Sequence, residues 1–147
     1  MEMLFGLPAH PLITHFPVVG IPLVAIASIV LVIRPQKLDE NGLLVAGFSI
    51  LTAIATILAA SSGEALAELL TSGEEISKHR ELGETLRTLS VLQTVTIIGM
   101  VGAARRDASS TVKTVISVGV VITSILALIW VIRTGHEGAS QSWGFLS

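Results

Sequence analysis

The chain has 147 residues, of which 51% are hydrophobic and 14% are charged, whereas ordinary globular domains carry about 25% charged residues. Its mean hydropathy is +0.79, and a soluble chain of this size needs more polar surface than that. The formal net charge of −2 argues against nucleic-acid binding. Because cysteine is absent, disulfides, thiolate metal sites and c-type haem attachment within this chain are excluded. The composition predicts a small integral membrane protein with a single domain, residues 1–147.

Several apolar stretches are long enough to cross a bilayer, which takes about 20 residues of helix. The first begins with Pro11, which suits the first position of a helix. Pro17 and Pro22 lie inside it, and we expect kinks there because each removes a backbone hydrogen bond. Gln93, Thr94 and Thr96 are the polar residues expected to face the interior from the third stretch. The predicted spans are residues 11–33, 43–62, 84–104 and 112–133. The sequence therefore predicts an all-α fold, an integral membrane four-helix bundle.

The chain becomes polar between the second and third spans, and the helix boundaries there are open. The second helix continues past Glu64, or a short interfacial helix follows it. Ser77 is suited to cap a third helix that starts at Lys78. After the fourth span, Gly135 is suited to end the helix.

The distribution of basic residues predicts the orientation in the membrane. An even number of spans puts both termini on one side, together with the connection between the second and third spans. The two short turns on the other side concentrate basic residues, as cytoplasmic segments do. These residues are Arg34, Lys37, Arg105, Arg106 and Lys113. We therefore expect the short turns in the cytoplasm, and the termini on the periplasmic or extracellular side of the inner (plasma) membrane.

All the histidines fall on the side of the termini, and they are the main functional clue. Metal and cofactor sites in helix bundles are built from side chains on facing helices. Imidazole suits zinc, copper and iron, and haem accepts histidine as an axial ligand. Acidic residues at the ends of the second and third helices complete the set. The candidate ligands are His10, His15, His79, His136, Glu64 and Glu81.

A simpler interpretation is a scattered polar rim. The side of the termini holds most of the residues outside the spans, so histidines gather there by default and lie half-hydrated. His10 and His15 are five residues apart, which turns them about 140° from each other on a regular helix. From the residues alone, both interpretations are about equally supported. The chain has no His-Glu-x-x-His pair, P-loop or nucleophile elbow, so a hydrolase is disfavoured.

Three motifs resemble a known family. They are His10-Pro11-x-x-x-His15-Phe16-Pro17, Ser62-Gly63-Glu64 and Thr134-Gly135-His136-x-Gly138. Over nearly the whole chain, the pattern resembles a family of predicted bacterial membrane proteins known as domain of unknown function 2231. Some members of that family are joined to Rieske-type or cytochrome-c-type modules, so the resemblance implies a redox role with haem or another metal held by the histidines. The chain departs from the family after Gly138, where Ala139-Ser140 replaces a Gly-Gly and an aromatic residue.

The leading hypothesis is electron transfer through a histidine-ligated centre near the outer face, with haem b ahead of a bare metal ion. The histidines are the predicted haem ligands, and Glu64 and Glu81 ligate a metal or orient the imidazoles. One alternative is a non-haem iron, copper or zinc site. Another is a cofactor-free accessory subunit of a larger membrane complex. The expected partners are the lipid bilayer and a redox partner protein or larger complex.

Overall fold

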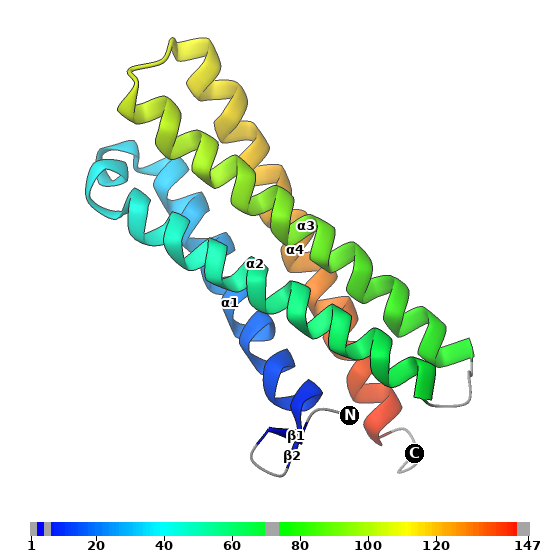
Figure 1. Cartoon of the computed structure of the whole chain (residues 1–147). Coiled ribbons are helices and arrows are strands. Elements are labelled where there is room, and N and C mark those ends of the chain that lie inside the picture. The colour runs from blue at the N-terminus through cyan, green and yellow to red at the C-terminus, as the bar shows by residue number, and fades with distance from the viewer. Residues whose placement is uncertain (1–2, 5–6, 70–73, 144–147) are drawn as a thin grey trace.

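The computed structural model describes the backbone of residues 3–4, 7–69 and 74–143 and the side chains of residues 14–62, 78 and 80–138. Its long helices are α1 (Ala9–Ile33), α2 (Leu38–Leu69), α3 (Glu74–Arg105) and α4 (Ser110–Trp143). The 3-10 helix η1 (Pro35–Lys37) joins α1 to α2, and the short strands β1 (Met3–Leu4) and β2 (Leu7–Pro8) pair antiparallel ahead of α1. Figure 1 shows the helices packed in an up-and-down bundle. We refer to the end with η1 and the α3–α4 turn as the turn end, and to the other as the termini end.

All the long helices are apolar enough to cross a membrane. The candidate spans are Thr14–Ile33, Pro35–Ser62, Arg80–Arg105 and Ser110–Gly138. Large apolar side chains on their outer faces are exposed, with 72% for Leu44 and 71% for Ile33. A soluble monomer rarely exposes a continuous apolar surface of this extent, whereas lipid covers it without penalty. The predicted all-α, four-helix membrane bundle is confirmed.

Several helix boundaries differ from the sequence-based expectation. α2 continues to Leu69 as one helix, so no separate interfacial helix follows Glu64 within the described part of this segment. α3 begins at Glu74, ahead of the cap predicted at Ser77. α4 passes through Gly135 without ending there. In each case the predicted boundary rested on a local signal, and packing against a neighbouring helix routinely overrides such signals.

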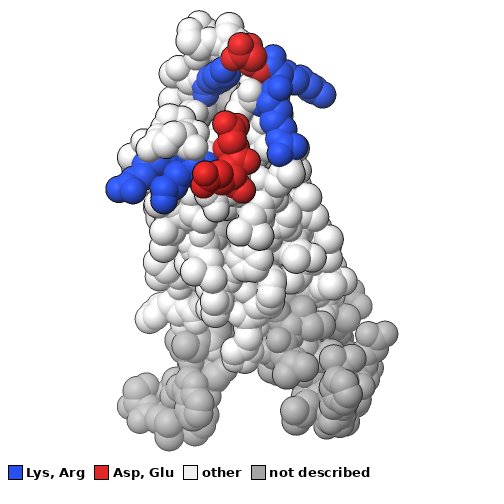
Figure 2. All heavy atoms as spheres, turned by 90° about the vertical axis from the view of Figure 1, so that its left-hand side faces the viewer, with Lys and Arg blue, Asp and Glu red and all other residues white. Residues whose placement is uncertain are grey.

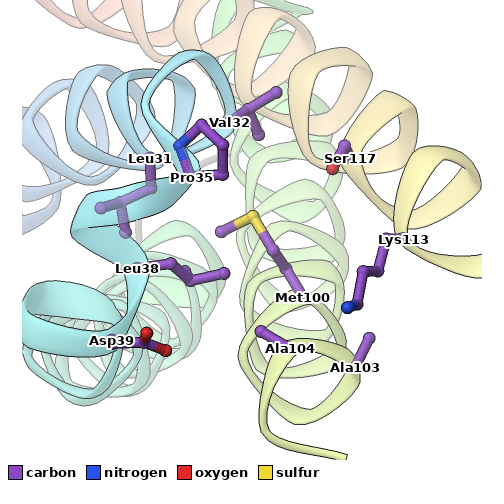
Figure 3. Close-up of a pocket in the computed structure, with 10 residues that line it drawn as sticks. All are labelled: Leu31, Val32, Pro35, Leu38, Asp39, Met100, Ala103, Ala104, Lys113 and Ser117. Atoms are coloured by element: carbon purple, nitrogen blue, oxygen red, sulfur yellow. The ribbon is translucent and has the colours of Figure 1, made fainter. Parts of the chain in front are cut away.

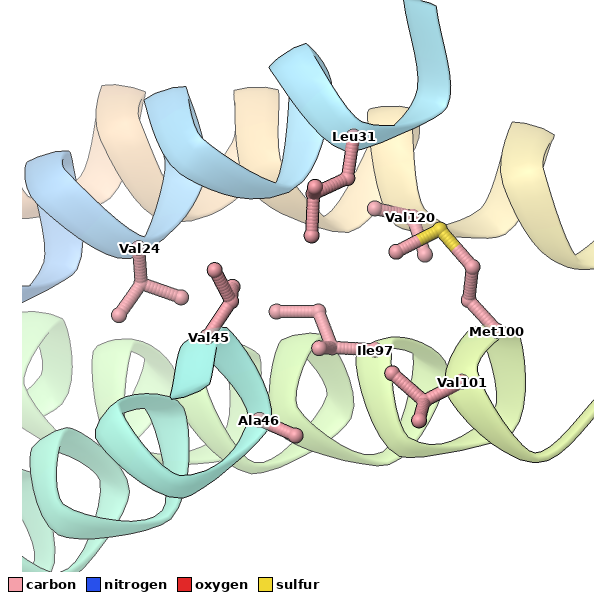
Figure 4. Close-up of a cluster of buried hydrophobic side chains, with 8 residues drawn as sticks. All are labelled: Val24, Leu31, Val45, Ala46, Ile97, Met100, Val101 and Val120. Atoms are coloured by element: carbon pink, nitrogen blue, oxygen red, sulfur yellow. The ribbon is translucent and has the colours of Figure 1, made fainter. Parts of the chain in front are cut away.

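The interior of the bundle at the turn end is an apolar cluster to which every long helix contributes (Figure 4). Its buried members are Val24, Leu31, Val45, Ala46, Ile97, Met100, Val101 and Val120. A second cluster lies nearer the termini end and contains Ile21, Leu86, Ala127 and Val131. Small residues bring the helices close together, since a Cβ atom on Gly20 of α1 would lie 2.9 Å from Oγ1 of Thr52 on α2. Close packing through small residues is the usual source of helix association in lipid.

α3 ends in a Schellman motif at Asp107. The Asp107 N–H donates to the Ala104 carbonyl at 3.1 Å, and the Ala108 N–H donates to the Ala103 carbonyl at 2.9 Å, which is the bonding pattern of this motif. Asp107 has a φ of 48°, in the left-handed region that favours glycine. A hydrogen bond from Lys113 and its positive charge hold the pKa of Asp107 below its usual value. The pair therefore favours folding at neutral pH, and this contribution is lost as the pH falls through the lowered pKa.

We expect Asp107→Gly to leave the protein as stable as the parent, or more stable by up to about 1 kcal/mol. Glycine adopts this backbone conformation without strain, and the lost ion pair with Lys113 is exposed and contributes little. Thermal unfolding in detergent measures the effect. Asp107→Ala is the control, because it loses the same ion pair and keeps the strain. A lower melting temperature for the glycine variant than for the alanine variant would contradict this account.

Candidate functional site

Side-chain contacts fix how the helices are aligned along the bundle. Between α3 and α4, Gln93 Nε2 donates to Ser124 Oγ at 3.3 Å, and Lys78 Nζ lies 2.9 Å from Glu137 Oε2. Between α1 and α4, the Ser28 and Ser124 hydroxyl oxygens are 3.0 Å apart. Because neighbouring helices run antiparallel, each step forward along one helix is matched by a step back along the next. The levels of other residues can therefore be counted from these contacts.

This alignment brings candidate ligands of α1, α3 and α4 to one level at the termini end. Counted from the Gln93–Ser124 bond, Glu81 of α3 lies opposite His136 of α4. Counted from the Ser28–Ser124 contact, His15 of α1 lies within one residue of the level of His136. A residue of helix rises about 1.5 Å, so these three backbone positions share one thin layer.

The remaining candidates are placed near the same end of the bundle, Glu64 and His79 relative to each other. Thr94 Oγ1 of α3 donates to the Ser49 carbonyl of α2 at 3.1 Å. Counted from this bond, Glu64 of α2 lies level with His79 of α3. His79 is two residues from Glu81 on α3, which corresponds to about 3 Å along the axis. His10 precedes His15 on α1 by more than one turn and so lies further out.

The described side chains of this layer point outward. His15, Glu81 and His136 are exposed, and His15 shares its face of α1 with the lipid-facing Ile33, while His136 follows the exposed Ile132 by one turn. Among the described side chains, no group of three or more His, Cys, Asp or Glu residues could hold a metal ion. The side chains of the other candidates, His10, His79 and Glu64, lie outside the described residues. The structure thus places His15, Glu81 and His136 near one level and directs the imidazoles of His15 and His136 to the outer surface.

Two contacts of charged side chains lie in this layer, one between α3 and α4 and one within α4. The first is the Lys78–Glu137 ion pair. Lys78 directly precedes His79 in the sequence, and Glu137 directly follows His136. The Glu137 side chain in this pair is only 16% exposed, so its charge is better shielded from water than that of a surface pair. One turn before His136 along α4, the Arg133 guanidinium lies 5.2 Å from the centre of the Trp130 ring, a cation–π contact. On α4, the charged side chains of this layer therefore make defined contacts with other side chains.

A layer of polar side chains crosses the middle of the bundle. Its buried members come from every long helix and are Ser28, Ser49, Gln93, Thr94 and Ser124. The expectation that Gln93 and Thr94 face the interior is confirmed, since both are buried. Thr96 is half-buried, and its hydroxyl oxygen lies 3.1 Å from that of Thr123 on α4. Gln93 donates one hydrogen bond, to Ser124, and its Oε1 accepts none from any described residue. Polar contacts of this kind fix the pairing of helices in lipid.

A cavity of about 270 Å³ opens at the turn end of the bundle (Figure 3). Leu31, Leu38 and Met100 give it an apolar wall, and Asp39 and Lys113 are the charged residues that line it. A second cavity of about 410 Å³ runs between α1 and α4. The two cavities share Val32, Pro35, Lys113 and Ser117. They therefore adjoin at these residues, and we refer to the two together as the turn-end groove.

The turn-end groove was missed in the sequence because separate elements line it. One signal was present, however, in the first three turns of α4. Lys113, Ser117 and Val121 are spaced by four residues, so they fall on one face of a helix. A basic, a hydroxyl and an apolar residue in this order mark the face that lines the groove.

Comparison with known protein families matches residues 6–146 to a family model described as predicted membrane protein, DUF2231. The match spans all the long helices and includes the histidine motifs at both ends of the sequence. Comparisons with curated proteins and with solved structures give no significant match. Because the family model covers nearly the whole chain, the protein belongs to the DUF2231 family of predicted membrane proteins.

Proposed function

We propose that this integral membrane protein holds a histidine-ligated redox centre at its termini end and transfers electrons through it. Haem b is the first candidate for the centre. The supporting observation is the shared level of His15, His79 and His136 on three different helices, which follows from the antiparallel contacts of the polar layer. Histidines on neighbouring helices are a common way to hold a cofactor in a helix bundle.

The donor set is compatible with haem iron. Imidazole is an axial ligand of haem iron, and carboxylates orient ligating imidazoles through hydrogen bonds. His10, His15, His79 and His136 are the proposed ligands, with Glu64 and Glu81 as orienting groups. Since His15 and His136 are exposed, a centre held by them lies at the outer surface of the bundle. That position favours exchange of electrons with a partner protein.

The basic turn end supports an orientation for the protein in the membrane. The turn end carries the residues Arg34, Lys37, Arg105, Arg106 and Lys113 close to the short connections. Short connections rich in Lys and Arg remain in the cytoplasm. We therefore propose that the termini end, with the redox centre, faces the periplasm or the extracellular space from the inner (plasma) membrane.

Two further functions are distinguished by the same experiment. A non-haem iron, copper or zinc site would use the same histidines with Glu64 or Glu81 as a direct ligand. The outward direction of His15 and His136 also favours an accessory subunit, since polar side chains exposed at this level lie where a larger membrane complex would contact the chain. In that case the chain itself carries no cofactor.

The test is a visible spectrum of isolated membranes and of purified protein, oxidised and then reduced with dithionite, together with metal analysis. We expect haem bands in the parent, and their loss in His15→Ala and His136→Ala. Lys37→Ala is the matched control, because Lys37 is an exposed charged residue at the turn end and its replacement should leave the bands unchanged.

Each alternative result has a definite meaning. A colourless parent with stoichiometric metal would replace haem by a bare metal site. A folded parent that is colourless and metal-free, in membranes as well as in detergent, would support the accessory subunit. Haem bands that persist at full height in both histidine variants would remove His15 and His136 from the ligand set.

A further inference from the structure

We propose that the turn-end groove between α1 and α4 is a binding site for one anionic phospholipid. The phosphate lies at Lys113, the glycerol esters lie at Thr114 and Ser117, and an acyl chain follows Val121 and Ile122. This inference concerns the turn end and is independent of the proposed redox centre at the termini end.

The order of side chains along α4 carries the proposal. Lys113 lines both cavities of the groove, and Thr114 and Ser117 follow it with hydroxyl groups. One turn further along α4, Val118, Val121 and Ile122 line the same cavity, and Val32 of α1 faces them. Charge, hydroxyl and apolar groups thus succeed one another in the direction from the turn end into the bilayer. A phospholipid presents phosphate, ester and hydrocarbon in the same order.

The position of the groove suits a lipid that enters from the bilayer. Val118 and Ile122 are exposed by 53% and 52%, on a helix that spans the membrane, so this part of the groove opens toward hydrocarbon. The cavity of about 270 Å³ at the turn end has an apolar wall of Leu31, Leu38 and Met100. A groove of about 410 Å³ holds part of a phospholipid and leaves the rest in the surrounding bilayer.

The charges of the turn end favour an anionic headgroup. Figure 2 shows that the charged side chains on this face of the described chain gather at the turn end, above an uncharged surface. Basic residues outnumber acidic ones there, since Asp39, Glu40 and Asp107 stand against five Lys and Arg residues. In the cavity of about 410 Å³ between α1 and α4, Lys113 is the charged lining residue. Its ammonium donates to Asp107 at 2.8 Å, and an ammonium has further donors for a phosphate.

Native mass spectrometry of the purified protein tests this proposal. The probe is an equimolar mixture of phosphatidylglycerol and phosphatidylcholine with identical acyl chains. We expect the parent to retain phosphatidylglycerol at least about fivefold better than phosphatidylcholine, which corresponds to the effect of one basic residue near an anionic lipid. Lys113→Gln should remove that preference, whereas Lys37→Gln, which changes an exposed basic residue outside both cavities, should keep it.

Two more variants separate the headgroup contact from the ion pair and from the groove. Asp107→Asn removes the partner of Lys113 and should retain phosphatidylglycerol as well as the parent or better. Val121→Trp fills the groove and should reduce retention of both lipids, and circular dichroism verifies that each variant is folded. Equal retention of the two lipids by the parent, or an undiminished preference in Lys113→Gln, would overturn the proposal. Stronger retention of phosphatidylcholine would also overturn it.

Discussion

Gly20→Leu is expected to lower the free energy of unfolding by about 3 kcal/mol or more. A Cβ at this position would already lie 2.9 Å from Thr52 Oγ1 and 3.0 Å from Thr52 Cγ2. Thr52 cannot turn away easily, because its branched side chain is stiff and its hydroxyl donates to the Phe48 carbonyl at 2.9 Å. The larger side chain therefore forces α1 and α2 apart. Chemical unfolding in mixed micelles, followed by circular dichroism, measures the loss.

Gly47→Leu is the matched control for this substitution. Gly47 lies on α2 in the same pair of helices, but nothing lies within 4 Å of a Cβ built there, and the position is exposed. Leucine has a higher helix propensity than glycine by somewhat less than about 1 kcal/mol, so this variant should be as stable as the parent or slightly more stable. Equal stability of the Gly20 and Gly47 variants would show that α1 and α2 are not in close contact at Thr52.

Ser124→Leu should destabilise the bundle to a similar extent, by about 3 kcal/mol. Ser124 is fully buried, and its hydroxyl contacts Ser28 of α1 at 3.0 Å and accepts a hydrogen bond from Gln93 of α3. Leucine would overfill the space between α1, α3 and α4. It would also leave the Gln93 amide without the one hydrogen bond described for it. The same unfolding assay measures this effect.

Two companion variants divide the expected loss at Ser124 into its causes. Ser124→Ala removes the hydroxyl without adding bulk and should cost about 1 kcal/mol, the usual contribution of a polar contact between membrane helices. Ile125→Leu changes the next residue, which is 46% exposed, and should leave stability unchanged. If Ser124→Leu lowered the free energy of unfolding no more than Ser124→Ala does, this would contradict the close packing of the helices around Ser124.

The fold was predictable because length and hydropathy act over whole segments. Each span is apolar over enough residues to cross a bilayer, and the short turns follow from the prolines and charges between them. Helix ends were less predictable. Ser77 is a good local signal for a helix start and Gly135 is one for a helix end, yet α3 begins earlier, at Glu74, and α4 continues past Gly135. In α4 the longer helix is rewarded by the Lys78–Glu137 ion pair, whose glutamate lies beyond Gly135.

The sequence predicted at which end of the bundle the candidate residues lie, but it did not predict the direction in which their side chains point. An even number of spans places the histidines near one end, and this requires only the count of helices. The direction of a side chain depends on the rotation of its helix about its own axis. That rotation is set by buried contacts such as Ser28 with Ser124, and it turns His15 and His136 outward. No local motif in the sequence reports this rotation.

The uneven hydropathy of the helices has a consequence for how the protein is made. The most apolar stretch of α3 has a mean hydropathy of 1.4, against 2.7 for that of α4, and the polar groups Gln93 and Thr96 on α3 bond to Ser124 and Thr123 on α4. A span that carries polar side chains is less stable in lipid until a neighbouring helix supplies hydrogen-bond partners for them. The short turn at Asp107 puts that partner next in synthesis. We therefore expect α3 and α4 to enter the bilayer as one hairpin, with α3 stably integrated once α4 has left the ribosome.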